Sequence, residues 1–105
     1  MNLVVISGKI CGNIDMGLDG EASKCKFKIK SQYYSPSRGA KLTTIVPCLA
    51  YGAVADYCYN ELWEGCNVII TGAILFQRYE VNGRTLDRMY IRCNTISKLE
   101  QEEYA

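Results

Sequence analysis

Four lysines alternate with apolar residues in the segment Lys24-Cys-Lys-Phe-Lys-Ile-Lys30. In an extended strand alternate side chains point to the same face, so these lysines would form a row of ammonium groups about 6.6 Å apart. Cys25, Phe27 and Ile29 would then face a core. Ammonium groups bind phosphate, and no acid interrupts the row. The alternative is a solvated strand whose lysines only prevent edge-to-edge aggregation.

Residues 66–97 hold a second set of charged and aromatic side chains. Two β-rich runs flank Asn82-Gly83 there, and this dipeptide is the strongest short-range hairpin signal, because both residues tolerate the positive φ of a type I′ turn. Guanidinium groups beside phenol rings suit a partner that carries phosphates and bases. Pairing of one or two arginines with Glu80 and Asp87 is the alternative. The side chains are Arg78, Tyr79, Arg84, Arg88, Tyr90 and Arg92, of which Arg92 is the least well placed for a nucleic acid.

The placement of charge is more informative than its total. The chain of 105 residues has a net charge of +1, with 12 basic and 11 acidic residues. Three of the acids are Glu100, Glu102 and Glu103, so residues 1–99 hold 8 acids against 12 bases, or +4. This is weaker than the basic balance of many duplex-DNA binders. The total charge alone therefore does not identify a nucleic-acid partner.

The residue content argues against catalysis. The chain has no histidine, so the usual proton shuttle and nucleophile partner are missing. Asp15, Asp19 and Glu21 lack the ligand spacing of a calcium loop, and we interpret them as turn residues. The six cysteines form no CxxC pair, and we expect reduced, buried, small hydrophobic side chains. We therefore predict a protein that is not an enzyme, with no metal, no cofactor and no small-molecule substrate.

The sequence also bears on the protein's location. No apolar run is long enough to cross a membrane. Residues 1–8 lack the basic start and the small-residue cleavage site of a signal peptide. We expect a cytoplasmic protein with no membrane partner.

The pattern along the chain predicts five strands and one short helix. We expect a first strand over residues 2–10 with a bend at Gly8, a connection over 12–23, and the lysine strand over 24–30. A loop over 33–40 leads to a third strand over 41–51, in which Pro47 indicates an edge or a bulge. Residues 53–63 form the helix, with an apolar stripe at Val54, Cys58 and Leu62 and a C-terminal cap at Gly65. The hairpin supplies the last two strands.

This order of elements predicts an all-β protein with the OB-fold, a five-stranded Greek-key barrel with one short helix between strands three and four. By length the chain is one domain. We assign residues 1–99 to this domain and residues 100–105 to a short acidic C-terminal end. Fold alone does not give function, so the residues must decide it.

The sequence resembles the bacterial single-stranded DNA-binding protein family over residues 1–99. Each matching segment is weak alone, and their order and spacing carry the resemblance. The segments are Met1-Asn2-x-Val4-x-Ile6-x-Gly8-Lys9-Ile10, Cys25-x-Phe27-x-Ile29, Leu49-Ala50-Tyr51-Gly52-x-x-Ala55, Leu62-x-x-Gly65-x-x-Val68-x-Ile70-x-Gly72-x-Ile74, and Tyr79-Glu80-x-x-Gly83.

The resemblance implies single-stranded DNA binding without sequence preference, which protects or organises exposed strands in replication, repair, recombination or DNA transfer. It implies base stacking on Tyr34, Tyr51 and Tyr79, with basic side chains along the phosphates. The resemblance is therefore what favours phosphate contact by the lysine row over a solvated strand. It also implies a homo-oligomer, a tetramer or a dimer, for which the apolar run Leu3–Ile6 is a candidate contact. The predicted DNA-binding residues are Lys24, Lys26, Lys28, Lys30, Tyr34, Arg38, Tyr51, Arg78, Tyr79, Arg84 and Arg88.

Two departures from the family pattern matter. Ile45 stands where a tryptophan is often found early in the third strand, which would weaken base stacking. The family's Gly/Gln/Pro-rich tail with an acidic tip is missing, since the chain ends at Ala105, so the resemblance is to a short, tailless member. Recruitment of repair partners through such a tip is therefore not expected.

Two other functions stay open. One is a primosome-type accessory OB-fold protein that binds strands but acts mainly through protein partners. The other is an OB-fold assembly subunit without nucleic-acid binding, which Ile45 and the small net charge would favour. We interpret Tyr57, Tyr59 and Trp63 as packing or subunit contacts, and Tyr90 as either a stacking residue or a subunit contact.

Overall fold

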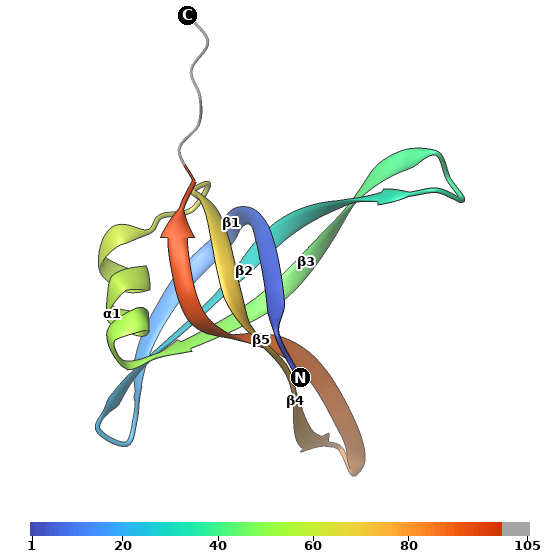
Figure 1. The fold of residues 1–105 in the computed structure, drawn as a ribbon. Helices are drawn as coiled ribbons and strands as arrows, with labels where there is room; N and C mark the ends of the chain where they lie inside the picture. The colour runs from blue at the N-terminus through green and yellow to red at the C-terminus, as the bar shows by residue number, and fades with distance from the viewer. Residues whose placement is uncertain (100–105) are drawn as a thin grey trace, which may run out of the picture.

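The computed structural model describes residues 1–99, which form five strands and one helix. The elements are β1 (Val4–Asp19), β2 (Ala22–Ser35), β3 (Ala40–Tyr51), α1 (Gly52–Glu61), β4 (Asn67–Val81) and β5 (Arg84–Lys98). The strands close into a barrel in the order β1-β2-β3-β5-β4 (Figure 1). This confirms the predicted five-stranded OB-fold with its helix between β3 and β4. The predicted acidic C-terminal end lies outside the described residues.

The apolar residues that alternate with the lysines of β2 face the barrel interior. Cys25, Phe27 and Ile29 of β2 are buried and lie opposite Ala50, Cys48 and Val46 of β3, respectively. Five of the six cysteines are buried as expected, while Cys11 is only half-buried, and all six are free thiols.

β1 is much longer than predicted. Its register with β2 jumps between Cys11 and Asp15, where three residues of β1 face one residue of β2. Gly12 has a φ of +74° in this bulge, which lets the strand bend around the barrel and then pair with β2 as far as Asp19. The predicted connection over residues 12–23 is therefore mostly strand. Asp15 and Asp19 lie in β1, and the turn is formed by residues 20–21.

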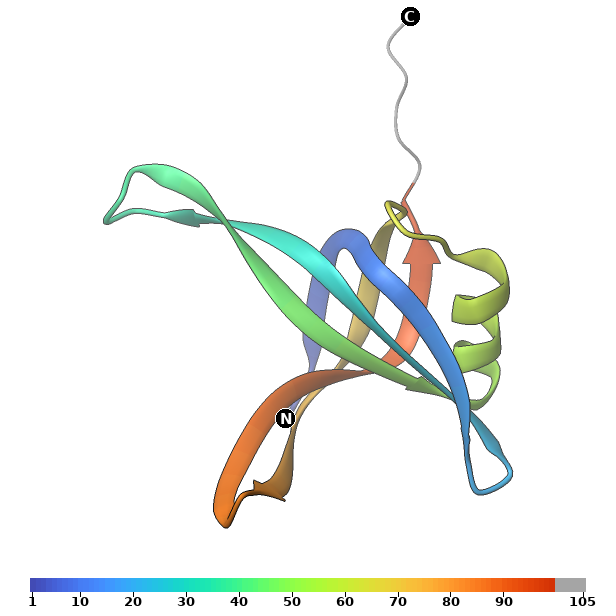
Figure 2. The same cartoon turned by 180° about the vertical axis from the view of Figure 1, so that it is seen from behind.

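Strands β2 and β3 also extend beyond their predicted ends. They stay paired from Lys24 and Tyr51 to Ser35 and Ala40, and the turn covers only residues 36–39. The outer part of this hairpin projects from the barrel as an arm (Figures 1 and 2). The predicted loop over residues 33–40 is thus mainly the tip of a long antiparallel ladder.

Two special positions in the strands have physical reasons. Gly8 lies in a stretch of β1 that pairs with β4 without a bulge. An added Cβ there would lie 2.5 Å from the carbonyl oxygen of Lys30, so the close approach of β2 requires glycine. Pro47 pairs with Lys28 of β2, and β3 pairs with β5 only at Cys48 and Leu49. Pro47 therefore lies beside an open stretch of β3, which confirms its predicted edge character.

Helix α1 covers one end of the barrel (Figure 1). It buries Ala55 and Cys58 and ends earlier than predicted, because Leu62 is already extended as the C-cap. Gly65 lies in a separate turn and donates its backbone N–H to the Ile10 carbonyl at 2.8 Å. Within residues 1–99 no helix has the length and apolar character needed to cross a bilayer.

Candidate nucleic-acid interface

The lysine row lies on the outer surface of the barrel. Because Cys25, Phe27 and Ile29 point inward, the alternating lysines of β2 point outward. Directly opposite residues of an antiparallel pair share a face, so the lysines share theirs with every second residue of β3. The opposite pairs are Lys24 with Tyr51, Lys26 with Leu49, Lys28 with Pro47, and Lys30 with Ile45.

The β4–β5 hairpin continues this outer surface. Leu49 lies beside Arg92 of β5 in the short parallel ladder, so Arg92 belongs to the same face. From Arg92 to the hairpin tip every second residue of β5 stays on that face, together with its partner on β4. The partner pairs are Arg92 with Ala73, Tyr90 with Leu75, Arg88 with Gln77, Leu86 with Tyr79, and Arg84 with Val81. Leu49 is only 8% exposed, although it lies on the outer face.

We call this combined surface the cationic face, because six basic side chains lie along it without counting the tips. Their ammonium and guanidinium groups can bind phosphates, and the tyrosine rings between them can stack on bases. Within the OB-fold the strand 2–3 face and the β1–β2 and β4–β5 loops are the usual oligonucleotide-binding surface, which is where this face lies. The six cations are Lys24, Lys26, Lys28, Lys30, Arg88 and Arg92.

Cations lie close to two of the tyrosine rings of the cationic face. The Arg92 guanidinium lies 5.1 Å from the centroid of the Tyr51 ring, and the Lys24 ammonium lies 6.0 Å from the same centroid. The Arg88 guanidinium lies 5.8 Å from the centroid of the Tyr79 ring. Contacts of this kind contribute about 0.5–1 kcal/mol at exposed sites. We therefore include Arg92 in the candidate interface, whereas the sequence alone ranks it last among the four arginines.

Arg78 does not lie on the cationic face. It follows Gln77 and precedes Tyr79, so its side chain points to the opposite side of the hairpin. There its Nε atom donates a hydrogen bond to the Oδ1 atom of Asp87 at 2.9 Å. The cross-strand alternative is right for this arginine. We remove Arg78 from the candidate interface for this reason.

The remaining predicted residues lie at the two ends of the cationic face. Tyr34 is exposed on the arm opposite Lys41, and Arg38 lies in the turn at the arm's tip. Arg84 lies at the tip of the β4–β5 hairpin. The arm and the hairpin project from the barrel in different directions (Figures 1 and 2). A chain that contacts both tips would therefore have to cross the barrel wall between them.

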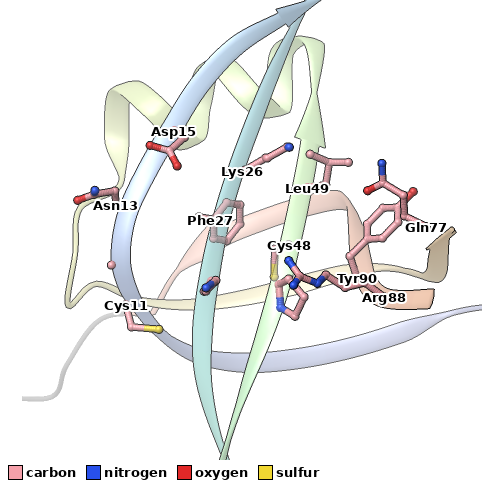
Figure 3. Close-up of a pocket in the computed structure, with 13 residues that line it drawn as sticks. Cys11, Asn13, Asp15, Lys26, Phe27, Cys48, Leu49, Gln77, Arg88 and Tyr90 are labelled. Atoms are coloured by element: carbon pink, nitrogen blue, oxygen red, sulfur yellow. The ribbon is translucent and has the colours of Figure 1, made fainter. Parts of the chain in front are cut away.

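A groove of about 350 Å³ lies in the middle of the cationic face (Figure 3). Pro47 and Leu49 of β3 lie between its two sides. The bulged part of β1 lies along one side, and Gln77, Arg88 and Tyr90 of the hairpin lie on the other. The remaining lining residues are Cys11, Gly12, Asn13, Asp15, Lys26, Phe27, Lys28 and Cys48.

Sequence reasoning missed several residues of this surface. From the sequence alone Tyr90 has two interpretations and Arg92 ranks last among the arginines, although both lie an even number of residues from Arg84 and Arg88 and so share their face of β5. Because alternate residues of a strand face the same side, Arg84, Arg88, Tyr90 and Arg92 are expected on one face of the hairpin and Arg78 on the other. Asp15 and Gln77 carry no such signal, because the β1 bulge and the register of the hairpin bring them to the groove.

Ile45 occupies an exposed position on this side of the barrel, opposite Lys30, and is 55% exposed. It presents a branched aliphatic side chain where an aromatic ring would offer a stacking surface. The flat aromatic surfaces of the cationic face are therefore those of Tyr51, Tyr79 and Tyr90.

Two of the buried thiols have raised pKa values. A hydrogen bond with Cys93 and burial raise the pKa of the Cys48 thiol, and a hydrogen bond with Cys25 and burial raise the pKa of the Cys58 thiol. Both thiols therefore stay protonated at neutral pH. In the part of the chain that the structure describes, no three His, Cys, Asp or Glu side chains gather to hold a metal ion.

Comparison with solved structures finds the same fold. The SSB of Plasmodium falciparum, solved in complex with ssDNA, superposes with a TM-score of 0.85 and 17% sequence identity over 95% of this chain and 96% of that one. A deletion mutant of the single-stranded DNA binding protein from Thermus aquaticus gives a TM-score of 0.74 and 17% identity over 95% of this chain and 51% of that one. No protein-family model and no curated protein matches the sequence. The chain therefore shares the OB-fold of these two proteins, although its sequence differs from both at most positions.

Proposed function

We propose that the protein binds single-stranded DNA without strong sequence preference through the cationic face. The observation that carries the proposal is that six cations and the rings of Tyr51, Tyr79 and Tyr90 share one continuous surface. The names of the two similar structures, an SSB bound to ssDNA and a single-stranded DNA binding protein, support the same function.

The chemistry of the face favours unpaired over paired DNA. Bases of a single strand expose their flat surfaces, and stacking on an aromatic ring is worth about 1–3 kcal/mol per base. A duplex hides those surfaces, and residues 1–99 present no helix flanked by basic side chains for the major groove. The proposed strand follows the β2 lysines, passes Tyr51 and Arg92, and continues along the hairpin past Tyr90 and Tyr79.

We also propose that copies of the chain assemble through β1 into a dimer or tetramer. Leu3 and Val5 are 62% and 61% exposed on the barrel surface. Burial of such side chains in a second copy would remove apolar area from water at about 25 cal/mol per Å². The cytoplasmic role that we propose is protection of strands exposed in replication, repair, recombination or DNA transfer.

A titration with oligo-dT at two salt concentrations, followed by light scattering, tests the proposal. We expect binding that weakens steeply with salt, because each released counterion contributes to the slope. The mass of the free protein and of the complex gives the number of chains per strand. Absence of any binding at low salt would refute the proposed function and would favour the assembly subunit without nucleic-acid binding.

One observation favours a second candidate, the accessory protein that acts through protein partners. Tyr59 and Trp63, on and just after α1, are exposed and do not belong to the strands of the cationic face, and the Lys98 ammonium lies 5.3 Å from the Trp63 ring centroid. Exposed aromatic residues are enriched at protein interfaces. Capture of a replicative helicase by the wild-type protein but not by a Trp63→Ala variant would support this candidate.

A further inference from the structure

One carboxylate lies in the groove of the cationic face. Asp15 of β1 is opposite Lys26 of β2 in the ladder, yet the one ion pair among residues 1–99 is Arg78 with Asp87. The Asp15 carboxylate is therefore exposed and without an ionic partner, and the other charged residues that line the groove, Lys26, Lys28 and Arg88, are cations. It would repel a phosphate. A carboxylate in this groove is compatible with DNA binding if its oxygens accept hydrogen bonds from a base.

The two sides of the groove offer opposite hydrogen-bonding chemistry. On the β1 side, Asp15 lines the groove and offers two acceptor oxygens (Figure 3). On the hairpin side, Arg88 offers several N–H donors, and Gln77 beside it offers an amide. The Tyr90 ring supplies an aromatic surface on the same side. The groove volume of about 350 Å³ is within the range of small-ligand sites and leaves room for a single base.

Among the four DNA bases, guanine matches this arrangement. Its N1–H and N2 amino groups are neighbouring donors on one edge, which a carboxylate accepts together. Its O6 and N7 atoms are acceptors on another edge, and arginine bound to O6 and N7 is the commonest specific base contact. Thymine has one ring N–H between two carbonyl groups, and adenine and cytosine place an amino donor next to a ring-nitrogen acceptor.

We propose that this groove is a base subsite that prefers guanine, with Asp15 accepting from N1–H and the N2 amino group and Arg88 donating toward O6 and N7. This inference rests on the proposed single-stranded DNA binding. It gives an otherwise sequence-tolerant surface one position at which the base identity changes the affinity.

Competition binding with oligo-dT of about 12 nucleotides, a length within the site sizes of OB-folds, tests the subsite. One central thymidine is replaced by deoxyguanosine, by deoxyinosine, which lacks the N2 amino group, or by 7-deazadeoxyguanosine, which lacks N7. We expect the guanine oligonucleotide to bind about fivefold or more tighter than plain oligo-dT, because a good bidentate base contact gives discrimination of at least that size. Each analogue should lose a large part of this gain.

Asp15→Asn is the matching protein variant, and Asp56→Asn on the exposed surface of α1 is its control, because it changes the net charge equally. Asp15→Asn should bind plain oligo-dT at least as tightly as the wild type, since it removes a negative charge from the face. Its preference for guanine over inosine should shrink, because the amide keeps only one acceptor oxygen and carries no charge. Asp56→Asn should keep the distinction.

Each outcome separates the subsite from the proposed function. Equal binding of the guanine, inosine and thymine oligonucleotides by a protein that binds oligo-dT would overturn the subsite and leave the function intact. An unchanged guanine-to-inosine ratio in Asp15→Asn, or the same loss in Asp56→Asn, would overturn the role of Asp15. A protein that binds none of the oligonucleotides at low salt would overturn the proposed function itself.

Discussion

The salt dependence of binding follows from the number of cations on the cationic face. For single strands, each phosphate contact contributes about 0.7 to the slope of log affinity against log salt concentration. Contacts by all six cations would give a slope of about −4.2, which corresponds to a loss of about 300-fold in affinity between 50 and 200 mM salt. Replacement of Lys26 and Lys28 by glutamine leaves four cations. The slope should fall to about −2.8 and the loss to about 50-fold over the same range.

The matched control replaces Arg78 and Lys98 by glutamine. It removes the same amount of charge from places outside the cationic face, because Arg78 pairs with Asp87 and Lys98 lies over Trp63. Fluorescence anisotropy with labelled oligo-dT at four or more salt concentrations measures the slopes, and circular dichroism verifies the fold. The reasoning is refuted if the control lowers the slope as much as the Lys26 and Lys28 substitutions do.

The structure makes three further predictions. Tyr51→Ala should weaken oligo-dT binding about fivefold or more in a fluorescence titration, since one stacked base is worth about 1–3 kcal/mol; Tyr59→Ala on α1 should not, and equal effects would argue against stacking on Tyr51. Gly8→Ala should lower the free energy of unfolding by about 1–3 kcal/mol in urea, because the new Cβ meets the β2 backbone; unchanged stability would contradict this close approach. The Cys58 thiol is protonated and buried, so it should react with a thiol reagent at pH 8 only after denaturant is added. Mass spectrometry of the peptides measures the reaction, and modified Cys58 in the native protein would contradict this prediction.

Local sequence patterns were sufficient for much of the fold. The strict alternation over residues 24–30 set which side chains of β2 face the core, and Asn82-Gly83 located the hairpin turn, where Asn82 has a φ of +51°. The order of strands around a single short helix then led to the OB-fold. These features depend on near neighbours in the chain, and local patterns record such neighbours well.

The errors arose where distant contacts decide the structure. The β1 bulge after Cys11 and the long arm of β2 and β3 depend on pairing with neighbouring strands, because turn-forming residues within them otherwise look like loops. The position of Arg92 beside Leu49 depends on a parallel contact between strands that are far apart in sequence. The exclusion of Arg78 needed only the two-residue period of a strand, and this signal was present in the sequence.

Photocrosslinking tests most directly whether the cationic face holds the bases of a single strand. Oligo-dT that carries 5-iodouracil at successive positions is irradiated with the protein, and the crosslinked peptides are identified by mass spectrometry. We predict crosslinks to the rings of Tyr51, Tyr79 and Tyr90. Crosslinks confined to Tyr57, Tyr59 and Trp63 would contradict the account, because these residues belong to α1 and the segment after it and not to the strands that form the cationic face.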